Sequence, residues 1–158
     1  MKKFLVVFLA LLLVPIATYA QNNAEVAYSV HMAGTGWGGY MSDGETAGTT
    51  GQSKQLEAIK VRIVSGIAGS VRYDTYGQGV QWLGWQYDND ISGSTGKNRR
   101  IEAIKVQLTG ELAKRFDIMY RVHMASVGWS GWSSNGEQAG TTGQSRQLEA
   151  IQIKLQPK

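Results

Sequence analysis

The chain has 158 residues, a formal net charge of +4 and no cysteine. Without disulfides, a chain of this size is held together by its hydrophobic core, which excludes the small disulfide-stapled scaffolds. The positive charge is weak and dispersed. This argues against a nucleic-acid partner, because proteins that bind nucleic acids carry a basic stripe on their surface. Glycine is abundant (20 residues) and proline scarce (2 residues), a balance typical of many tight turns.

The N-terminal segment has the features of a secretory signal peptide. Two lysines precede an apolar run over residues 4–16, and small residues lead to a cleavage site expected after Ala20. The run is shorter than the ~20 residues that span a bilayer, and no later run is longer. We therefore expect residues 1–20 to be removed, with retention as an anchor the alternative. The mature chain 21–158 is predicted to be secreted, extracellular or cell-wall associated, with no membrane span.

Three tandem copies of one unit fill the mature chain. Placing Tyr28, Tyr73 and Tyr120 in register aligns the residues that follow without a gap, at spacings of 45 and 47 residues. Internal repetition of this kind is the sequence signature of a repeat architecture. The copies occupy about residues 26–63, 71–108 and 118–155.

Each copy begins and ends with a segment of alternating apolar and polar residues. In the first copy these are 26–32 and 56–63, and a turn pair, Asp43 and Gly44, lies between them. Alternation with a period of two predicts strands with one buried and one wet face. We expect three or four short antiparallel strands per copy, and one helical turn at 111–114 before the third.

The repeats predict an all-β fold in a single domain with three-fold pseudosymmetry. A lone unit of two or three strands is marginally stable, so the three apolar faces must be buried together around a common axis. A β-prism-like arrangement meets this demand, and a β-trefoil-like arrangement is the alternative. An open solenoid is disfavoured because there are only three copies and neither end resembles a cap.

The copies resemble a known repeat, the clostridial hydrophobic repeat with a conserved tryptophan (ChW repeat). The likeness covers residues 26–155 and is carried by Gly36 with Trp37, by 47–53 and by 56–60. It implies export from a Gram-positive bacterium and attachment to a surface or substrate, and it implies no catalytic residues. The second copy departs from the pattern, so a shared ligand site is least expected there. Its departures are Gln81, Ser94, Lys97 and Asn98.

One aromatic column is the first candidate for ligand contact. Its members follow a glycine shared by the three copies and precede the turn, and exposed aromatic residues near loops often mark recognition. The turn residues are expected to add hydrogen bonds. A histidine or tyrosine column is expected on the solvated outer face. The candidate ligand-binding residues are Tyr40, Trp85, Trp132, Asp43, Asp88, Asn135, His31, Tyr76 and His123.

Two further columns are expected to be structural. The first tryptophan of each copy is predicted to plug the core at the axis, with sugar stacking as the alternative. A glutamate shares the parity of the apolar residues in the last strand. Because a bare buried carboxylate is costly, hydrogen bonds from the upstream Gly-Thr-Thr-Gly loop are expected to satisfy it. These columns are Trp37, Trp82 and Trp129, and Glu57, Glu102 and Glu149.

No catalytic motif is apparent, and we predict no enzyme activity, no metal and no cofactor. There is no Gly-x-Ser-x-Gly elbow, no His-Glu-x-x-His and no phosphate loop between a strand and a helix. We predict a lectin-like carbohydrate- or cell-wall-binding module with up to three related shallow sites, whose partner is a polysaccharide or cell-wall glycan. A protein–protein adhesin or surface assembly subunit that binds surface proteins is the alternative. A hydrolase, motivated by the repeated glutamates, is the weaker one.

Overall fold

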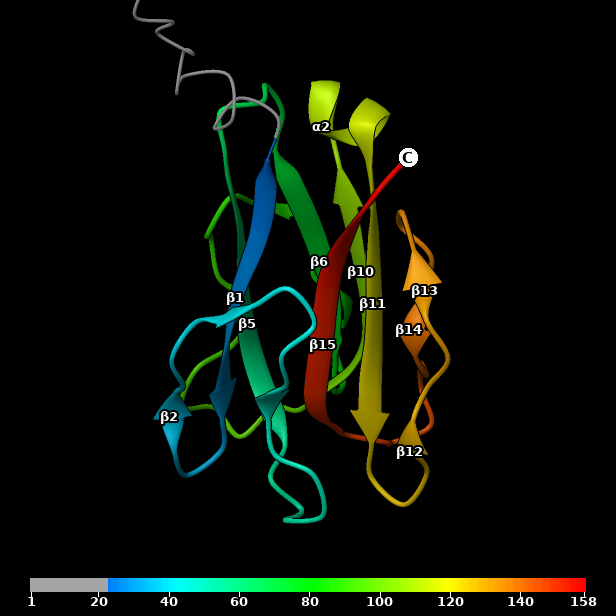
Figure 1. Cartoon of the computed structure of the whole chain (residues 1–158). Helices are drawn as coiled ribbons and strands as arrows, with labels where there is room; N and C mark the ends of the chain where they lie inside the picture. Colours follow the sequence, from blue (N-terminus) through cyan, green and yellow to red (C-terminus); the bar gives the residue numbers. More distant parts are fainter. Residues whose placement is uncertain (1–22) are drawn as a thin grey trace, which may run out of the picture.

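The computed structural model describes residues 23–158, so the predicted signal peptide at 1–20 lies outside the described residues. Each repeat forms five strands, and one short helix, α2 (Gly110–Arg115), precedes the third repeat as expected (Figure 1). The strands are β1 (Ala24–Met32), β2 (Gly36–Trp37), β3 (Met41–Ser42), β4 (Ala47–Gly48), β5 (Leu56–Ser65), β6 (Val71–Gly77), β7 (Gln81–Trp82), β8 (Gln86–Tyr87), β9 (Ser92–Gly93), β10 (Ile101–Leu108), β11 (Phe116–Met124), β12 (Gly128–Trp129), β13 (Ser133–Ser134), β14 (Ala139–Gly140) and β15 (Leu148–Pro157).

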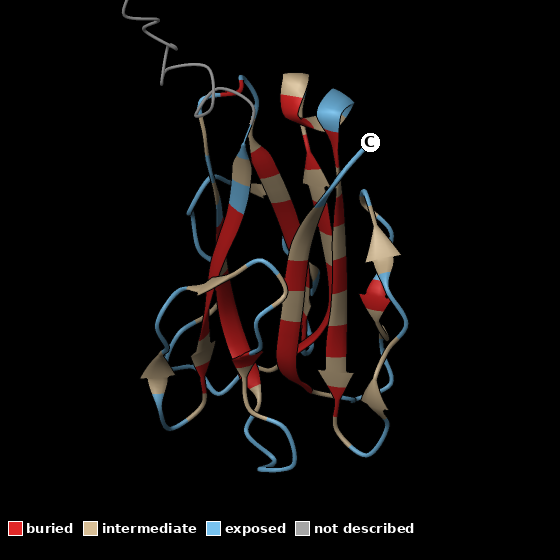
Figure 2. Ribbon diagram, in the orientation of Figure 1, coloured by how far each residue is buried: buried red, intermediate tan, exposed pale blue. Residues whose placement is uncertain are grey.

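The first and last strands of each repeat form a long antiparallel pair. These pairs are β1 with β5, β6 with β10, and β11 with β15. Buried and half-buried residues alternate along β11 from end to end (Figure 2), as the period of two predicts. The expected strand number of three or four per repeat is too low. The excess consists of two-residue strands, which are too short to carry a periodic signal.

The fourth strand of each repeat joins the sheet of another repeat. Strand β9 pairs with β5, β14 pairs with β10, and β4 of the first repeat pairs with β15 of the last. Three five-stranded sheets result, and each contains one strand donated by a neighbour. The chain is thereby closed into a ring in which every repeat both gives and receives a strand.

Three glycines make this strand donation possible. Gly48, Gly93 and Gly140 have φ values of +99°, +111° and +93°, where side chains are disfavoured. A Cβ atom at any of them would lie only 2.2–2.4 Å from a main-chain carbonyl oxygen of the receiving strand. That oxygen belongs to the glutamate of the neighbouring repeat. Both the backbone conformation and the close approach therefore require glycine.

Three tyrosines are the largest fully buried side chains of the core. Tyr28, Tyr73 and Tyr120 are 0 % exposed, and burial raises the pKa of each phenol to about 12. Each hydroxyl donates a hydrogen bond to a main-chain carbonyl 17 residues downstream, beyond the turn of its own repeat. This pays the desolvation cost of the hydroxyl and ties the turn to the core. The accepting carbonyls belong to Glu45, Asp90 and Glu137.

The predicted core role of the tryptophans is wrong. Trp37, Trp82 and Trp129 are only half-buried and lie outside the core cluster, in which the tyrosines are the largest fully buried side chains. The all-β fold of three similar repeats is confirmed. The finer choice between a β-prism and a β-trefoil stays a prediction.

Candidate functional site

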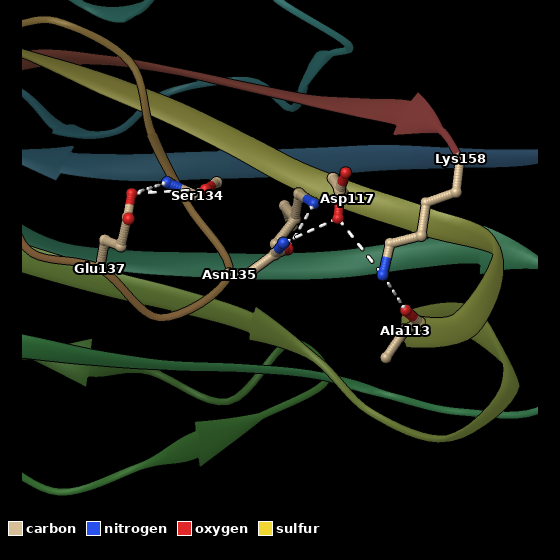
Figure 3. A network of polar contacts seen from close by, with 7 residues as sticks. Ala113, Asp117, Ser134, Asn135, Glu137 and Lys158 are labelled. Atoms are coloured by element: carbon tan, nitrogen blue, oxygen red, sulfur yellow. Dashed lines mark hydrogen bonds and ion pairs between the residues drawn. The ribbon is translucent and has the colours of Figure 1, made fainter.

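The turn residues proposed for ligand binding are engaged in the fold. The side-chain oxygens of Asp43, Asp88 and Asn135 each accept a hydrogen bond from a main-chain N–H at or near the start of the first strand of their own repeat, at 3.3, 3.0 and 3.1 Å. In the third repeat (Figure 3), Asn135 Nδ2 also donates to Asp117 Oδ1 at 2.7 Å. Lys158 Nζ lies 3.4 Å from the same carboxylate. These turns hold the ends of the long strands together.

The first tryptophan of each repeat lies on the outer face of its sheet. It pairs in register with the His or Tyr of the first strand and meets that ring edge-on, with centroids 5.4–5.7 Å apart. A cation lies over the indole at 4.4 Å in the first repeat, 4.2 Å in the second and 4.9 Å in the third. The cations are Lys60 over Trp37, Lys105 over Trp82 and Arg121 over Trp129.

The second aromatic residue of each repeat also carries a cation over its ring. Arg62 lies 4.2 Å from the Tyr40 centroid and Arg72 lies 4.6 Å from that of Trp85. Trp132 is contacted by two cations, Arg121 at 4.9 Å and Lys154 at 4.4 Å. Tyr40 and Trp132 are 41 % and 37 % exposed, as expected for this column, and Trp85 is half-buried.

We call the two aromatic rings and their cations in each repeat an outer strip. The three strips have aromatic rings at the same two positions but draw cations from different positions. Cations from first strands are Arg72 and Arg121, and cations from last strands are Lys60, Arg62, Lys105 and Lys154. Cations over ring faces are favourable by ~0.5–1 kcal/mol at exposed sites. The outer strips are therefore ordered surfaces that combine apolar ring area with positive charge.

Each strip borders the next repeat. The Tyr40 hydroxyl donates to Asn89 Oδ1, which belongs to the turn of the second repeat. On the third sheet, Gln152 Nε2 donates to Thr46 Oγ1 of the first repeat at 2.8 Å. The strand donation that closes the ring thus also assembles each strip's margin from two repeats.

The glutamate column is buried, as predicted, but it lies on the opposite face. In each long pair the register skips the glutamate, so that the residues on either side of it pair while it forms a β-bulge. A bulge shifts parity by one residue and re-aims the side chain. The carboxylate therefore points to the outer face. The upstream loop of its own repeat does not satisfy it; instead, the equivalent loop of another repeat donates a hydrogen bond to the glutamate main-chain oxygen. The residues concerned are Glu57, Glu102 and Glu149.

The cation or ring beside the glutamate differs between repeats. Glu57 Oε2 lies 3.1 Å from His31 Nδ1, and Glu149 Oε2 lies 3.1 Å from His123 Nδ1. The two histidine side chains are 15 % and 16 % exposed, so they are on the outer face but covered, not solvated as expected. In the second repeat the corresponding ring is Tyr76.

The second repeat satisfies its glutamate with an arginine instead. Arg100 Nε lies 2.9 Å from Glu102 Oε1. The other two repeats have glutamine at this position, with amide nitrogens 3.5 and 3.4 Å from their glutamates. The buried glutamate therefore has one of two sets of neighbours. In the first and third repeats these are a histidine and a glutamine, and in the second repeat they are a tyrosine and an arginine.

The cations of the outer strips are the residues that sequence reasoning missed. Their signal was present, because Lys60 and Arg62 alternate with buried Ile59 and Val61 and so share the outer face with the aromatic residues. Within residues 23–158 no three His, Cys, Asp or Glu side chains gather as a metal site. No helix in that part is long and apolar enough to cross a membrane.

Fold and surface together define a class: a closed ring of three β repeats, each presenting an aromatic strip to solvent. Comparison with known families gives this class a name. The model of the family described as Clostridial hydrophobic W (ChW) matches residues 31–65, 76–110 and 123–157, about two thirds of the chain. The chain therefore belongs to the ChW family. Searches of curated proteins and of solved structures found no match.

Proposed function

We propose that this protein is a carbohydrate-binding module whose three outer strips bind a cell-wall or surface polysaccharide outside the cytoplasm. The observation that carries the proposal is the presence, in all three repeats, of two outer aromatic rings fixed by cations. Aromatic rings offer apolar area to sugar rings, and indole N–H groups donate hydrogen bonds to hydroxyls. The cations add attraction for negatively charged groups on the polymer.

The arrangement of the strips favours a polymer over a single sugar. Each strip is a shallow surface, so one site alone binds weakly. Three related strips on one rigid ring raise the effective concentration of the second and third contacts once the first has formed. We therefore expect weak binding of short oligosaccharides and much tighter binding of the long polymer. Polysaccharides with negative charge are expected to bind more tightly than neutral ones, and added salt should reduce that difference.

A pull-down with insoluble polysaccharides tests the proposal. Alanine at Tyr40, Trp85 and Trp132 together should reduce retention by at least ~100-fold, and each single change by ~3- to 10-fold, since each removes one site from the set. Trp132→Tyr is the matched control, because the first repeat already uses tyrosine there. It should retain binding.

Folding is checked by near-ultraviolet circular dichroism and thermal unfolding of each variant. Absence of retention on every polysaccharide by the folded wild type would contradict the proposal, as would full retention by the folded triple variant. Oligomerisation of the wild type with no glycan binding would favour the adhesin or assembly alternative, which light scattering detects.

A further inference from the structure

The second repeat contains a pocket that lies apart from its outer strip residues. Its volume is about 200 Å³, and it is formed by the segments 77–83 and 93–101 together with Glu57 of the first repeat. The lining joins apolar side chains with three cationic ones. Such a combination of apolar wall and convergent charge is what small-ligand sites share.

The pocket lies where the second repeat lacks a methionine that the other two repeats have. Gly77 stands where the first and third repeats have Met32 and Met124, which are 9 % and 8 % exposed and belong to the core. Val80 leans into the vacated space, since a Cβ on Gly77 would lie 2.9 Å from Val80 Cγ2. Val80 and Leu83 nevertheless remain 40 % and 41 % exposed. The apolar wall is therefore incompletely covered by the protein itself.

The rim of the pocket carries unneutralised positive charge. Lys97 and Arg99 are exposed, and within residues 23–158 neither has an ion-pair or hydrogen-bond partner. The third cation, Arg100, is matched by Glu102 at 2.9 Å. Glu57 is the acidic group of the lining, so Lys97 and Arg99 leave an excess of positive charge.

This charge is particular to the second repeat. Positions 97, 99 and 100 are all cationic there, whereas the matching positions of the first repeat are Gln52, Lys54 and Gln55. The third repeat likewise has one cation among Gln144, Arg146 and Gln147. The pocket and the added cations thus occur together, in the one repeat that has lost the methionine.

We propose that this pocket binds a small aliphatic carboxylate, with the alkyl group against Val80 and Leu83 and the carboxylate between Lys97 and Arg99. A guanidinium pairs with a carboxylate in a bidentate geometry, and an ammonium adds a point charge. The volume lies below the ~300–1,000 Å³ of drug-sized sites, so the occupant is an acid of a few carbons or the carboxyl end of a peptide.

An NMR titration tests the site, using 4-methylpentanoate as the probe and its neutral amide as the control. The acid should shift the methyl signals of Val80 and Leu83 with a dissociation constant on the order of 1 mM, and the amide should bind at least ~10-fold more weakly. N-acetyl-leucine distinguishes the two sources of the carboxylate. Tighter binding than 4-methylpentanoate indicates a peptide end, and weaker binding indicates a free acid.

Two variants and a matched pair of controls complete the test. Arg99→Gln should weaken binding of the acid about 5-fold and leave the amide unchanged, because it removes only charge. Gly77→Met, which restores the side chain of the other repeats, should abolish binding. Lys54→Gln and Arg146→Gln remove the equivalent cations elsewhere and should bind as the wild type does.

Equal binding of acid and amide would overturn the proposal, as would wild-type affinity in folded Arg99→Gln. Inorganic phosphate binding as tightly as the acid would also overturn it, since the apolar wall would then contribute nothing. The inference is independent of the polysaccharide proposal. If the protein is retained on polysaccharide but does not bind the acid, this inference alone fails. If it binds the acid but is not retained on polysaccharide, the polysaccharide proposal alone fails.

Discussion

The second repeat differs from the first and third in several side chains while sharing their backbone contacts. All three have the donated glycine against a main-chain oxygen, the turn that holds the strand ends, and the buried tyrosine. The second repeat departs at positions outside these contacts, with Gly77 in place of a core methionine, Tyr76 in place of a histidine and Arg100 in place of a glutamine. The difference teaches that the ring is specified by backbone approaches, which leave side chains of the outer face and one core position near the strand end free to change.

The largest effect is expected at the donated glycines. Gly93→Ala places a Cβ 2.2 Å from the Glu57 carbonyl oxygen and forces a positive φ on alanine. Overpacking and backbone strain together should lower the free energy of unfolding by about 2–4 kcal/mol. Gly48→Ala and Gly140→Ala should cost as much, because the contact is common to all repeats. Urea unfolding followed by tryptophan fluorescence measures the loss.

Gly51→Ala separates the clash from the strain. Gly51 also has a positive φ, +70°, but a Cβ there meets nothing within 4 Å. It should cost only about 1 kcal/mol, the strain component. If Gly51→Ala proves as damaging as Gly48→Ala, close approach to the neighbouring strand is not what selects glycine in the donated strand.

A second effect tests the different partners of the buried glutamate. Arg100→Gln leaves Glu102, a buried carboxylate, without its cation and should destabilise the protein by about 2 kcal/mol. Adding Tyr76→His rebuilds the arrangement of the first and third repeats and should recover at least half of that loss. Thermal unfolding of the single and double variants measures the coupling. An additive or worse double variant would show that the two solutions are not interchangeable.

The core tyrosines should behave alike in the three repeats. Tyr28→Phe, Tyr73→Phe and Tyr120→Phe each leave a main-chain carbonyl without its donor and should cost about 1 kcal/mol. Because the folded pKa is raised to about 12 while an unfolded tyrosine has a pKa of ~10, the unfolded state loses its protons first. Stability is therefore complete below pH ~10 and falls as the pH rises toward 12.

A double variant makes this pH dependence visible. With two of the three tyrosines replaced, the alkaline fall in the unfolding midpoint should be clearly shallower than in the wild type. A fall that keeps its full size would assign the alkaline loss to groups other than the core phenols.

Much of the fold could be predicted because it depends on local pattern. Periodicity marks the long strands, and the repeats establish a three-fold arrangement. Two features escaped that reasoning for physical reasons. The bulge at Glu57 moves its side chain to the opposite face of the sheet through one extra residue, and the alternation of apolar and polar residues gives no sign of that residue. The donation of β4 to β15 links residues about 100 positions apart, and two-residue strands carry no periodic signal of their own.

The candidate site was predicted in part for the same reasons. The exposure of Tyr40 and Trp132 follows from their position between a glycine and a turn. The placement of cations over six rings does not follow from sequence position. Arg121 contacts both rings in the third repeat, whereas a separate side chain contacts each ring in the other two. Arginine and lysine are long enough to reach a ring from several positions, so many sequences produce the same strip.

The smallest effect concerns the turns, where the first and second repeats have an aspartate, Asp43 and Asp88, and the third has Asn135. Burial and the nearby Glu25 raise the pKa of Asp43, so its charged form is less favourable in the fold than in the unfolded chain. The stability it provides is present below pH ~3.9 and is lost as the pH rises through the folded pKa. Asp43→Asn should therefore be neutral or stabilising by up to ~0.5 kcal/mol at pH 7.

The third repeat shows why the substitution is tolerated and supplies its reciprocal. Asn135 keeps the hydrogen bond to the strand N–H, and its Nδ2 donates to Asp117, which occupies the position of Glu25. Asn135→Asp puts two carboxylates side by side and should destabilise the protein at pH 7, and less in acid, where protonation of one of the two relieves the repulsion and restores a donor. Urea unfolding at pH 7 and pH 4 measures both changes. Stabilisation by Asn135→Asp would mean that Lys158, which already contacts Asp117, governs the charge at this turn and that the repeats differ there too.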